Sequence, residues 1–307
     1  MTILNIVLPI FLVIGLGWLL RRLRFISAAD GSTLSRLIFH VAAPALLLRS
    51  AAQTTLSHSL DPRVIGVMAG GSAVYAAIIY LIVWRMRPAR RGVFAQGVHR
   101  SNMVFFGLPL IMGAYGQEAV GQVSVLVAVM VIAYNLLAVF LLTLPHRRRD
   151  QDQKAAWIDT GRNILLNPLA LACMGGIAMS ALGLRLPAAL DTAVDLVGRT
   201  ALPLALVSIG AGLDLARLRS EIPVTSAAIV LKLGLYPALI YAALRALGVS
   251  GVALSAPVLL AATPTAVVSY VMSKEMRGDS ELAGAMVIGT TLASLGTTVV
   301  WLLVLGV

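Results

Sequence analysis

Ten predominantly apolar stretches alternate with short polar connections along this chain. Each stretch is about 20 residues long, which is enough for an α-helix to cross the hydrocarbon core of a bilayer. None has the alternation of apolar and polar positions over about ten residues that marks a membrane β-strand. The pattern predicts an all-α polytopic membrane protein with ten transmembrane helices. They are expected at residues 3–20, 33–50, 64–84, 93–115, 119–143, 163–182, 190–213, 222–246, 252–273 and 283–306.

The two halves of the chain resemble each other weakly in the placement of proline. The spacing from Pro9 to Pro44, in the first two stretches, equals the spacing from Pro168 to Pro203 in the sixth and seventh. Together with five helices in each half, this spacing predicts an internal repeat. Because five is odd, the second half enters the membrane from the opposite side. The repeats are therefore inverted, an architecture typical of alternating-access carriers.

The domain division follows from this repeat. We expect a first five-helix repeat over residues 1–145, a cytoplasmic loop over residues 146–162 and a second five-helix repeat over residues 163–307. The polar loop is too short to form a soluble domain of its own.

Two of the apolar stretches contain a proline well inside the expected helix. The first is Phe105-Phe106-Gly107-Leu108-Pro109, and the second is Ala262-Thr263-Pro264-Thr265-Ala266. Proline lacks a backbone donor and clashes with the preceding turn, so each helix is expected to open there. Backbone groups freed at membrane depth must face protein or a wet cavity. Paired interruptions in the two halves are the sequence signal for the binding site of a secondary transporter.

Composition supports the membrane assignment, and the charge pattern orients it. Hydrophobic residues make up 59% of the chain and charged residues only 12%, about half the charged fraction of a soluble domain. By the positive-inside rule, the connections rich in Lys and Arg are cytoplasmic, so both termini lie outside the cytoplasmic membrane. Topology thus explains the net charge of +11 without nucleic-acid binding. The basic residues of these connections are Arg21, Arg22, Arg24, Arg85, Arg87, Arg90, Arg91, Arg147, Arg148, Arg149, Lys154, Arg217, Arg219, Lys274 and Arg277.

Polar side chains beside the two breaks are candidate substrate ligands. Asn102 offers two amide donors and an acceptor in the fourth helix. Thr263, Thr265 and Ser269 surround Pro264 in the ninth. An alternative remains for each: the asparagine can form an interhelical hydrogen bond, and the hydroxyls can satisfy carbonyl groups freed by the proline.

Lys232 is the most informative charge because it lies well inside the eighth apolar stretch. A lysine at that depth is costly to bury, and is by default a functional or paired residue. The alternative is snorkelling to the nearer membrane interface. The acidic residues all lie in loops or near helix ends, so the interior suits an anion better than a cation. A sodium site made of hydroxyls and carbonyls is the alternative.

Sequence motifs for catalysis are absent. The chain contains no His-Glu-x-x-His, no Gly-x-Ser-x-Gly and no phosphate-binding loop. We therefore expect no enzyme activity, no cofactor and no metal centre.

At these residues the chain resembles the auxin efflux carrier family, which also includes malonate-transporter-like bacterial proteins and is related in fold to bile-acid sodium symporters. The segment 101–110, with Asn102 seven residues before Pro109, is similar to the family's fourth-helix motif. Residues 263–275, which end in Lys-Glu, are similar to its ninth-helix motif, and Asn167-Pro168 is typical of its sixth helix. The resemblance covers essentially the whole chain.

The resemblance implies more than the residues alone. Helices 1, 2, 6 and 7 would form a scaffold that also mediates homodimerisation. Helices 3–5 and 8–10 would form a transport domain that moves like an elevator, with helices 4 and 9 crossing at their breaks. Asn102 would contact a substrate carboxylate. The expected substrate-binding residues are Asn102, Phe105, Gly107, Pro109, Thr263, Pro264, Thr265, Ser269 and Lys232.

The function predicted from the sequence is secondary transport of small organic anions, namely carboxylates. A sodium-coupled organic-anion symporter is an alternative within transport. A membrane sensor or channel-like protein that binds an anion without carrying it is an alternative from another class.

Overall fold

The computed structural model describes residues 3–53, 61–144, 168–212, 219 and 221–307. Within these ranges the chain is helical and contains no strand beyond one isolated β-bridge. Five helices are long and apolar enough to cross a membrane, and several shorter apolar helices accompany them. The long ones are Pro62–Ile82, Gln117–Thr143, Ala188–Ala211, Ile222–Ala246 and Ser280–Leu305. This composition is that of a polytopic helical membrane protein, as predicted.

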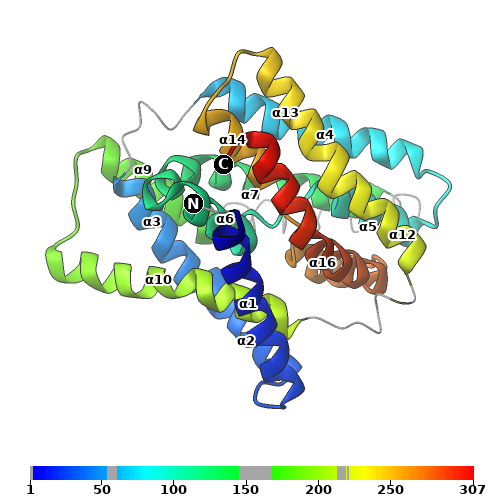
Figure 1. The fold of residues 1–307 in the computed structure, drawn as a ribbon, viewed down its shortest axis with the longest axis horizontal. Helices are drawn as coiled ribbons and strands as arrows, with labels where there is room; N and C mark the ends of the chain where they lie inside the picture. The colour runs from blue at the N-terminus through cyan, green and yellow to red at the C-terminus, as the bar shows by residue number, and fades with distance from the viewer. Residues whose placement is uncertain (1–2, 54–60, 145–167, 213–218, 220) are drawn as a thin grey trace.

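The helices of the first half follow the predicted apolar stretches closely (Figure 1). A π-helical turn, η1, joins α2 to α3, so that one helix continues through the second stretch. In the fourth stretch two helices stand where one was expected. The elements are α1 (Ile3–Arg22), α2 (Ala28–Leu37), η1 (Ile38–Ala42), α3 (Ala43–Gln53), α4 (Pro62–Ile82), α5 (Pro88–His99), η3 (Met103–Gly107), α6 (Leu108–Tyr115) and α7 (Gln117–Thr143).

The helices of the second half begin at the sixth predicted stretch. A π-helical turn, η5, again joins two α-helices, here α12 and α13. The ninth stretch is divided between α14 and α15. The elements are α9 (Pro168–Ala181), α10 (Ala188–Ala211), α12 (Ile222–Ile229), η5 (Val230–Leu235), α13 (Tyr236–Ala246), α14 (Val252–Ala261), α15 (Val268–Glu275) and α16 (Ser280–Leu305). The predicted loop at 146–162 lies outside the described residues.

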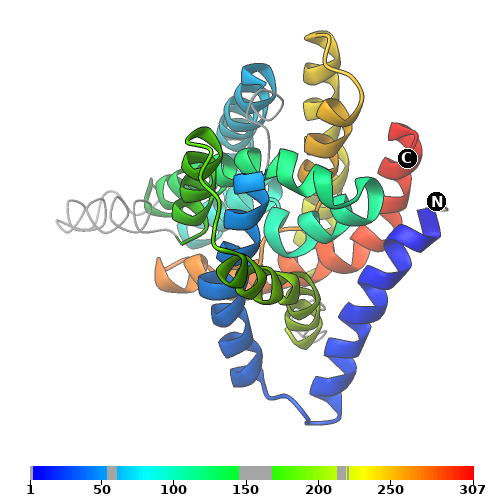
Figure 2. The same ribbon diagram turned by 90° about the vertical axis from the view of Figure 1, so that its left-hand side faces the viewer.

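Two groups of helices can be followed in Figures 1 and 2. In one, α1 packs along α10, and α3 packs against both α9 and α10. In the other, α4 packs against α5 and α13, while α16 packs against α12 and α15. The helix α7 contacts α5 and α4 as well as α3 and α9, and so links the groups.

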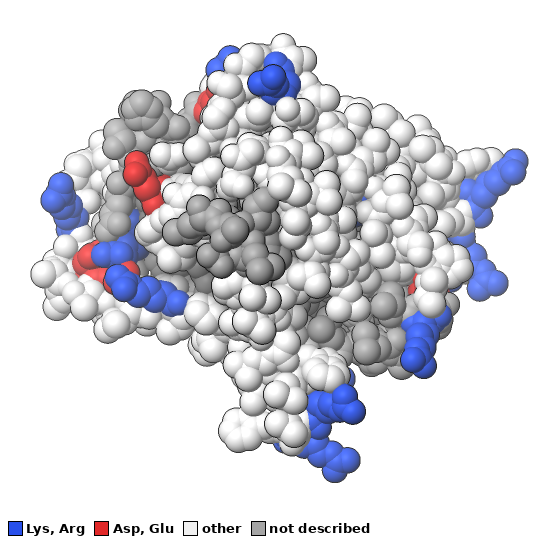
Figure 3. Space-filling model, in the orientation of Figure 1, with Lys and Arg blue, Asp and Glu red and all other residues white. Residues whose placement is uncertain are grey.

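The visible surface is mostly uncharged, and Lys and Arg gather in separate groups at its periphery (Figure 3). Large apolar side chains are exposed on several helices, for example Leu12 on α1 and Leu81 on α4. In water such a surface would be costly, whereas in a bilayer it faces lipid.

The α1–α10 pair is held at unusually short range by glycine. A Cβ added at Gly17 would lie 2.1 Å from the carbonyl oxygen of Val207, and one added at Gly210 would lie 1.9 Å from that of Ile14. Both contacts are with backbone, which cannot rotate away. Small residues let helix backbones approach this closely in membranes.

We therefore expect Gly17→Ala to force α1 and α10 apart and to destabilise the protein by about 1–3 kcal/mol, the usual effect of overpacking. Gly15→Ala is the matched control, because a Cβ on Gly15 meets nothing within 4 Å. The measurement is the melting temperature in detergent. Equal melting temperatures for the two variants would contradict the proposed close contact.

Candidate functional site

The ninth apolar stretch opens where the sequence predicts. Helix α14 ends at Ala261 and α15 begins at Val268. Pro264 lies in the non-helical segment between them, where its missing donor interrupts no helical hydrogen bond.

The fourth stretch opens at a different place from the one predicted. Helix α5 ends at His99, and the chain is non-helical at residues 100–102. The predicted break at Phe105–Pro109 is wrong: these residues lie in the π-helical turn η3 and the start of α6. The wider π-helical bonding, in which the Leu108 amide donates to the Met103 carbonyl, carries the chain into Pro109 without a gap. Pro109 is therefore tolerated at the helix start, where its lack of a donor costs little.

The two non-helical segments contact each other in the buried interior, and this contact is called the crossing below. Ser101 and Thr265 form an isolated antiparallel β-bridge. Backbone groups released from one helix thus bond to groups released from the other, as burial in a membrane requires. Two backbone hydrogen bonds form here. The backbone N–H of Asn102 donates to the backbone carbonyl of Pro264 at 2.8 Å, and the backbone N–H of Ala266 donates to the backbone carbonyl of Arg100 at 3.0 Å.

The hydroxyls of the ninth stretch mostly serve backbone groups. The Thr263 hydroxyl donates to the Leu260 carbonyl at 2.8 Å, and the Thr265 hydroxyl donates to the Gly97 carbonyl at 2.8 Å. The alternative interpretation is thus correct for Thr263, whereas the carbonyl that Thr265 binds lies near the end of α5. Ser269 differs, because its hydroxyl is buried and has no hydrogen-bond partner within the described residues.

Asn102 caps the π-helical turn and retains a free donor. Its Oδ1 accepts a hydrogen bond from the Phe105 amide at 3.3 Å. The side chain is only 5% exposed, and its Nδ2 has no partner in the described part of the chain. A buried donor without an acceptor is unfavourable, so a ligand that supplies one would be stabilised here.

Lys232 is fully buried and reaches the crossing itself. Its Nζ donates to the Ala261 carbonyl at 2.6 Å and to the Ser101 hydroxyl at 2.8 Å, and it lies 4.9 Å from the centre of the Tyr236 ring. Snorkelling is therefore excluded. The ammonium group ties the end of α14 to the first non-helical segment, and so satisfies a carbonyl freed by the second break.

The sequence of this protein is similar to known proteins over almost its whole length. Residues 2–302 match the family described as membrane transport protein. The chain belongs to this membrane transport family. A protein of Rhizobium meliloti named "Putative malonate transporter" is 29% identical over 303 residues, covering 95% of this chain and 92% of the relative. A protein of Methanothermobacter thermautotrophicus named "Uncharacterized transporter" is 24% identical over 302 residues, covering 97% of each. The role of the chain is membrane transport and not catalysis, as the sequence predicts.

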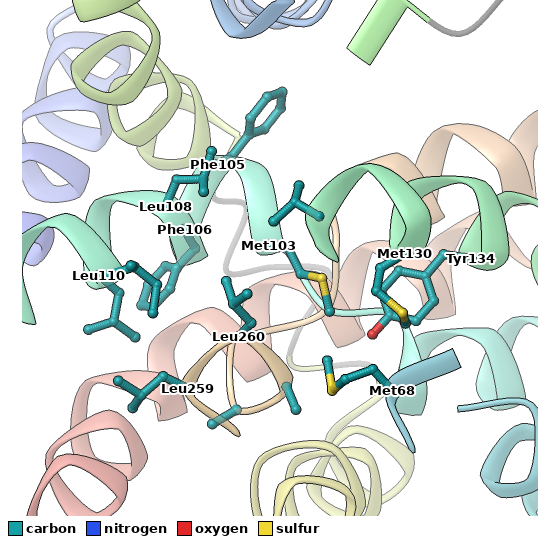
Figure 4. Packing of buried hydrophobic residues seen from close by; sticks show 14 of the residues in the cluster. Met68, Met103, Phe105, Phe106, Leu108, Leu110, Met130, Tyr134, Leu259 and Leu260 are labelled. Carbon is teal, nitrogen blue, oxygen red and sulfur yellow. The ribbon is translucent and has the colours of Figure 1, made fainter. Parts of the chain in front are cut away.

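A small cavity of about 60 Å³ lies beside the crossing of this transporter. Phe105 lines it, and the ring of Phe105 points away from the cluster around Phe106 (Figure 4). Phe39 of η1 lines it as well. The other lining residues are Arg100, Ser101, Met103, Val104, Val131, Tyr134, Asn135, Ala266 and Val268.

A larger cavity of about 610 Å³ lies between α1, α3 and α10 on one side and α6 on the other. Pro109 lines it from α6. Arg49 lines it from α3 and pairs with Asp191 and Asp195 of α10, at 3.0 and 2.6 Å. Sequence analysis did not single out this ion-pair network.

The predicted site residues are thus only partly brought together. Phe105 lies at the small cavity and Pro109 at the large one, while Asn102 borders neither. Gly107 is buried where an added Cβ would lie 2.6 Å from Leu260.

The sequence analysis also overlooked Arg100, although an arginine inside an apolar stretch is itself a signal. Arg100 is 5% exposed and lines the small cavity.

We expect Lys232→Met to loosen the crossing while leaving the fold intact, because the Ser101 hydroxyl still donates to the Ala261 carbonyl, at 3.1 Å. Backbone amides of residues 100–102, 262, 263, 265 and 266 should exchange with solvent at least about tenfold faster, as the loss of one charged hydrogen bond implies. Hydrogen exchange followed by mass spectrometry measures this, with amides of α1 and α10 as the internal control. Unchanged exchange at the crossing would show that Lys232 does not brace it.

Proposed function

We propose that this transporter is a secondary carrier of small carboxylates that works by alternating access. The observation that carries the proposal is the crossing of two interrupted helices, one from each half, with the unpaired amide donor of Asn102 beside it. Discontinuous helices supply free backbone and polar groups at the depth where transporters bind substrate.

We further propose that the two halves are inverted repeats of five spans each. Each half has one helix that ends at the crossing, α5 or α14, and one that begins beyond it, α6 or α15. The pair α1–α10 becomes the pair α9–α3 when the first two spans of each half are exchanged, and both pairs pack closely. The two ends of the chain lie near each other in both ribbon views (Figures 1 and 2), which suits an even number of spans.

The moving part would be the group of helices that carries the crossing. Helices α1, α3, α9 and α10 would form the scaffold, locked by the glycine contacts of α1 with α10 and by the ion pairs of Arg49. The large cavity lies along the boundary with α6, where it leaves room for one group to shift against the other. An elevator-like movement would carry the crossing past Phe39 of the scaffold.

The charges of the interior favour an anionic substrate. Among described side chains, Arg100 and Lys232 are the buried charged residues, and no buried carboxylate accompanies them. A carboxylate would offset this charge. Malonate is the first compound to test, because the Rhizobium relative bears its name. The location would be the cytoplasmic membrane, with both termini outside, because the basic connections would then be cytoplasmic.

Purified protein in liposomes loaded with malonate should take up labelled malonate by counterflow, since a carrier exchanges substrate across the membrane and a sensor does not. Replacing sodium with choline should leave the rate unchanged. Binding without exchange would favour the sensor, and loss of exchange without sodium would favour the symporter.

Asn102→Ser tests the amide donor directly. Serine retains an oxygen that can cap the following turn, so the melting temperature should stay close to wild type. Loss of the Nδ2 donor should weaken malonate binding about tenfold, the usual effect of one hydrogen bond to a charged group. Binding is measured by isothermal titration in detergent. Unchanged affinity would make Asn102 a cap and nothing more.

A further inference from the structure

The guanidinium of Arg100 is surrounded by weak and neutral acceptors. It donates to the Tyr134 carbonyl at 3.3 Å, to the Met272 sulfur at 3.0 Å and to the Asn135 Oδ1 at 2.5 Å. Thioether sulfur is a poor acceptor, and none of the three groups carries a charge. Within the described side chains, Arg100 forms no ion pair.

A buried arginine in such surroundings is electrostatically incomplete. Its charge is retained at any physiological pH, and burial without a counter-charge is unfavourable by several kcal/mol. Its planar fork matches a carboxylate in two parallel hydrogen bonds. The Nε–H makes no hydrogen bond in the described part of the chain, so the fork has a donor to spare.

Arg100 is almost fully buried and lies at the edge of a cavity. Arg100, Ser101 and Asn135 together line the cavity of about 60 Å³ beside the crossing. A water-sized probe occupies roughly 10–15 Å³, so the cavity holds a few such volumes. That space suits a short aliphatic acid and not an aromatic ring.

We infer that Arg100 binds the carboxylate of a short aliphatic acid in this cavity, and that Asn135 is the positioning residue that holds the guanidinium toward it. The inference rests on the proposed function and assigns the anion contact to a side chain outside the residues predicted from the sequence.

The first test is Arg100→Gln, with Arg87→Gln as the matched control. Arg87 is the exposed N-cap residue of the same helix, α5, and its side chain forms no cap hydrogen bond. Arg100→Gln should weaken malonate binding by at least about tenfold, as expected for a lost charged pair, while Arg87→Gln binds like wild type. Phenylacetate should compete poorly with malonate for the wild-type protein.

Asn135→Asp is the second test, and it does not depend on how Arg100→Gln folds. The new carboxylate would stand next to the guanidinium and take the place of the substrate anion. We expect a raised melting temperature without ligand, together with at least about tenfold weaker malonate binding. A merely structural asparagine would instead give a lower or unchanged melting temperature with unchanged affinity.

The outcomes separate this inference from the function on which it rests. If wild-type protein exchanges malonate and both variants bind it with undiminished affinity, the Arg100 assignment is wrong and the carrier proposal stands. Equal binding of phenylacetate and malonate would overturn the assignment to a short aliphatic acid. If wild-type protein neither binds nor exchanges any carboxylate, the carrier proposal fails and the inference fails with it.

Discussion

The exchange of backbone hydrogen bonds between two interrupted helices is the constraint on which the rest of this structure depends. A helix can open inside a bilayer only if its released amides and carbonyls find partners. Here each break supplies the partners of the other, through the bridge between Ser101 and Thr265. Neither opening would persist alone, so the two halves must fold against one another. Thr263 and Lys232 are among the buried polar side chains that serve backbone carbonyls at this place.

The two buried cations at the crossing have different surroundings, and this difference separates structure from binding. Lys232 donates to a carbonyl and a hydroxyl at short range, and its ammonium does not line the small cavity. The acceptors of Arg100 are neutral as well, but one of them is a weak thioether sulfur, and Arg100 borders that cavity. The lysine thus completes the crossing, whereas the arginine is left to be completed by a ligand. Sequence alone ranks the lysine first because it lies deeper in its apolar stretch.

Much of the fold was predictable because hydrophobic length is a strong signal in a membrane protein. The apolar stretches locate the helices, and Pro264 lies inside the second break. The break predicted at Pro109 was wrong because a proline removes one backbone donor but does not by itself determine the local backbone geometry. In the fourth stretch a π-helical turn absorbs that loss, and the chain opens seven residues earlier, beside Asn102. What fixes that opening is the pairing with the other half, which is a tertiary contact that no local pattern contains.

Close contacts hold α1, α3 and α10 together. Glycine at positions 17 and 210 brings α1 and α10 into backbone contact, and Arg49 clamps α3 to α10 through two carboxylates. These contacts lie within one group of helices. The large cavity lies between that group and α6. In the elevator-like movement that we propose, these internal contacts would hold the group together while the crossing moves. Phe39 of η1 lines the same small cavity as Arg100, so a shift of the crossing relative to η1 would change access to the guanidinium.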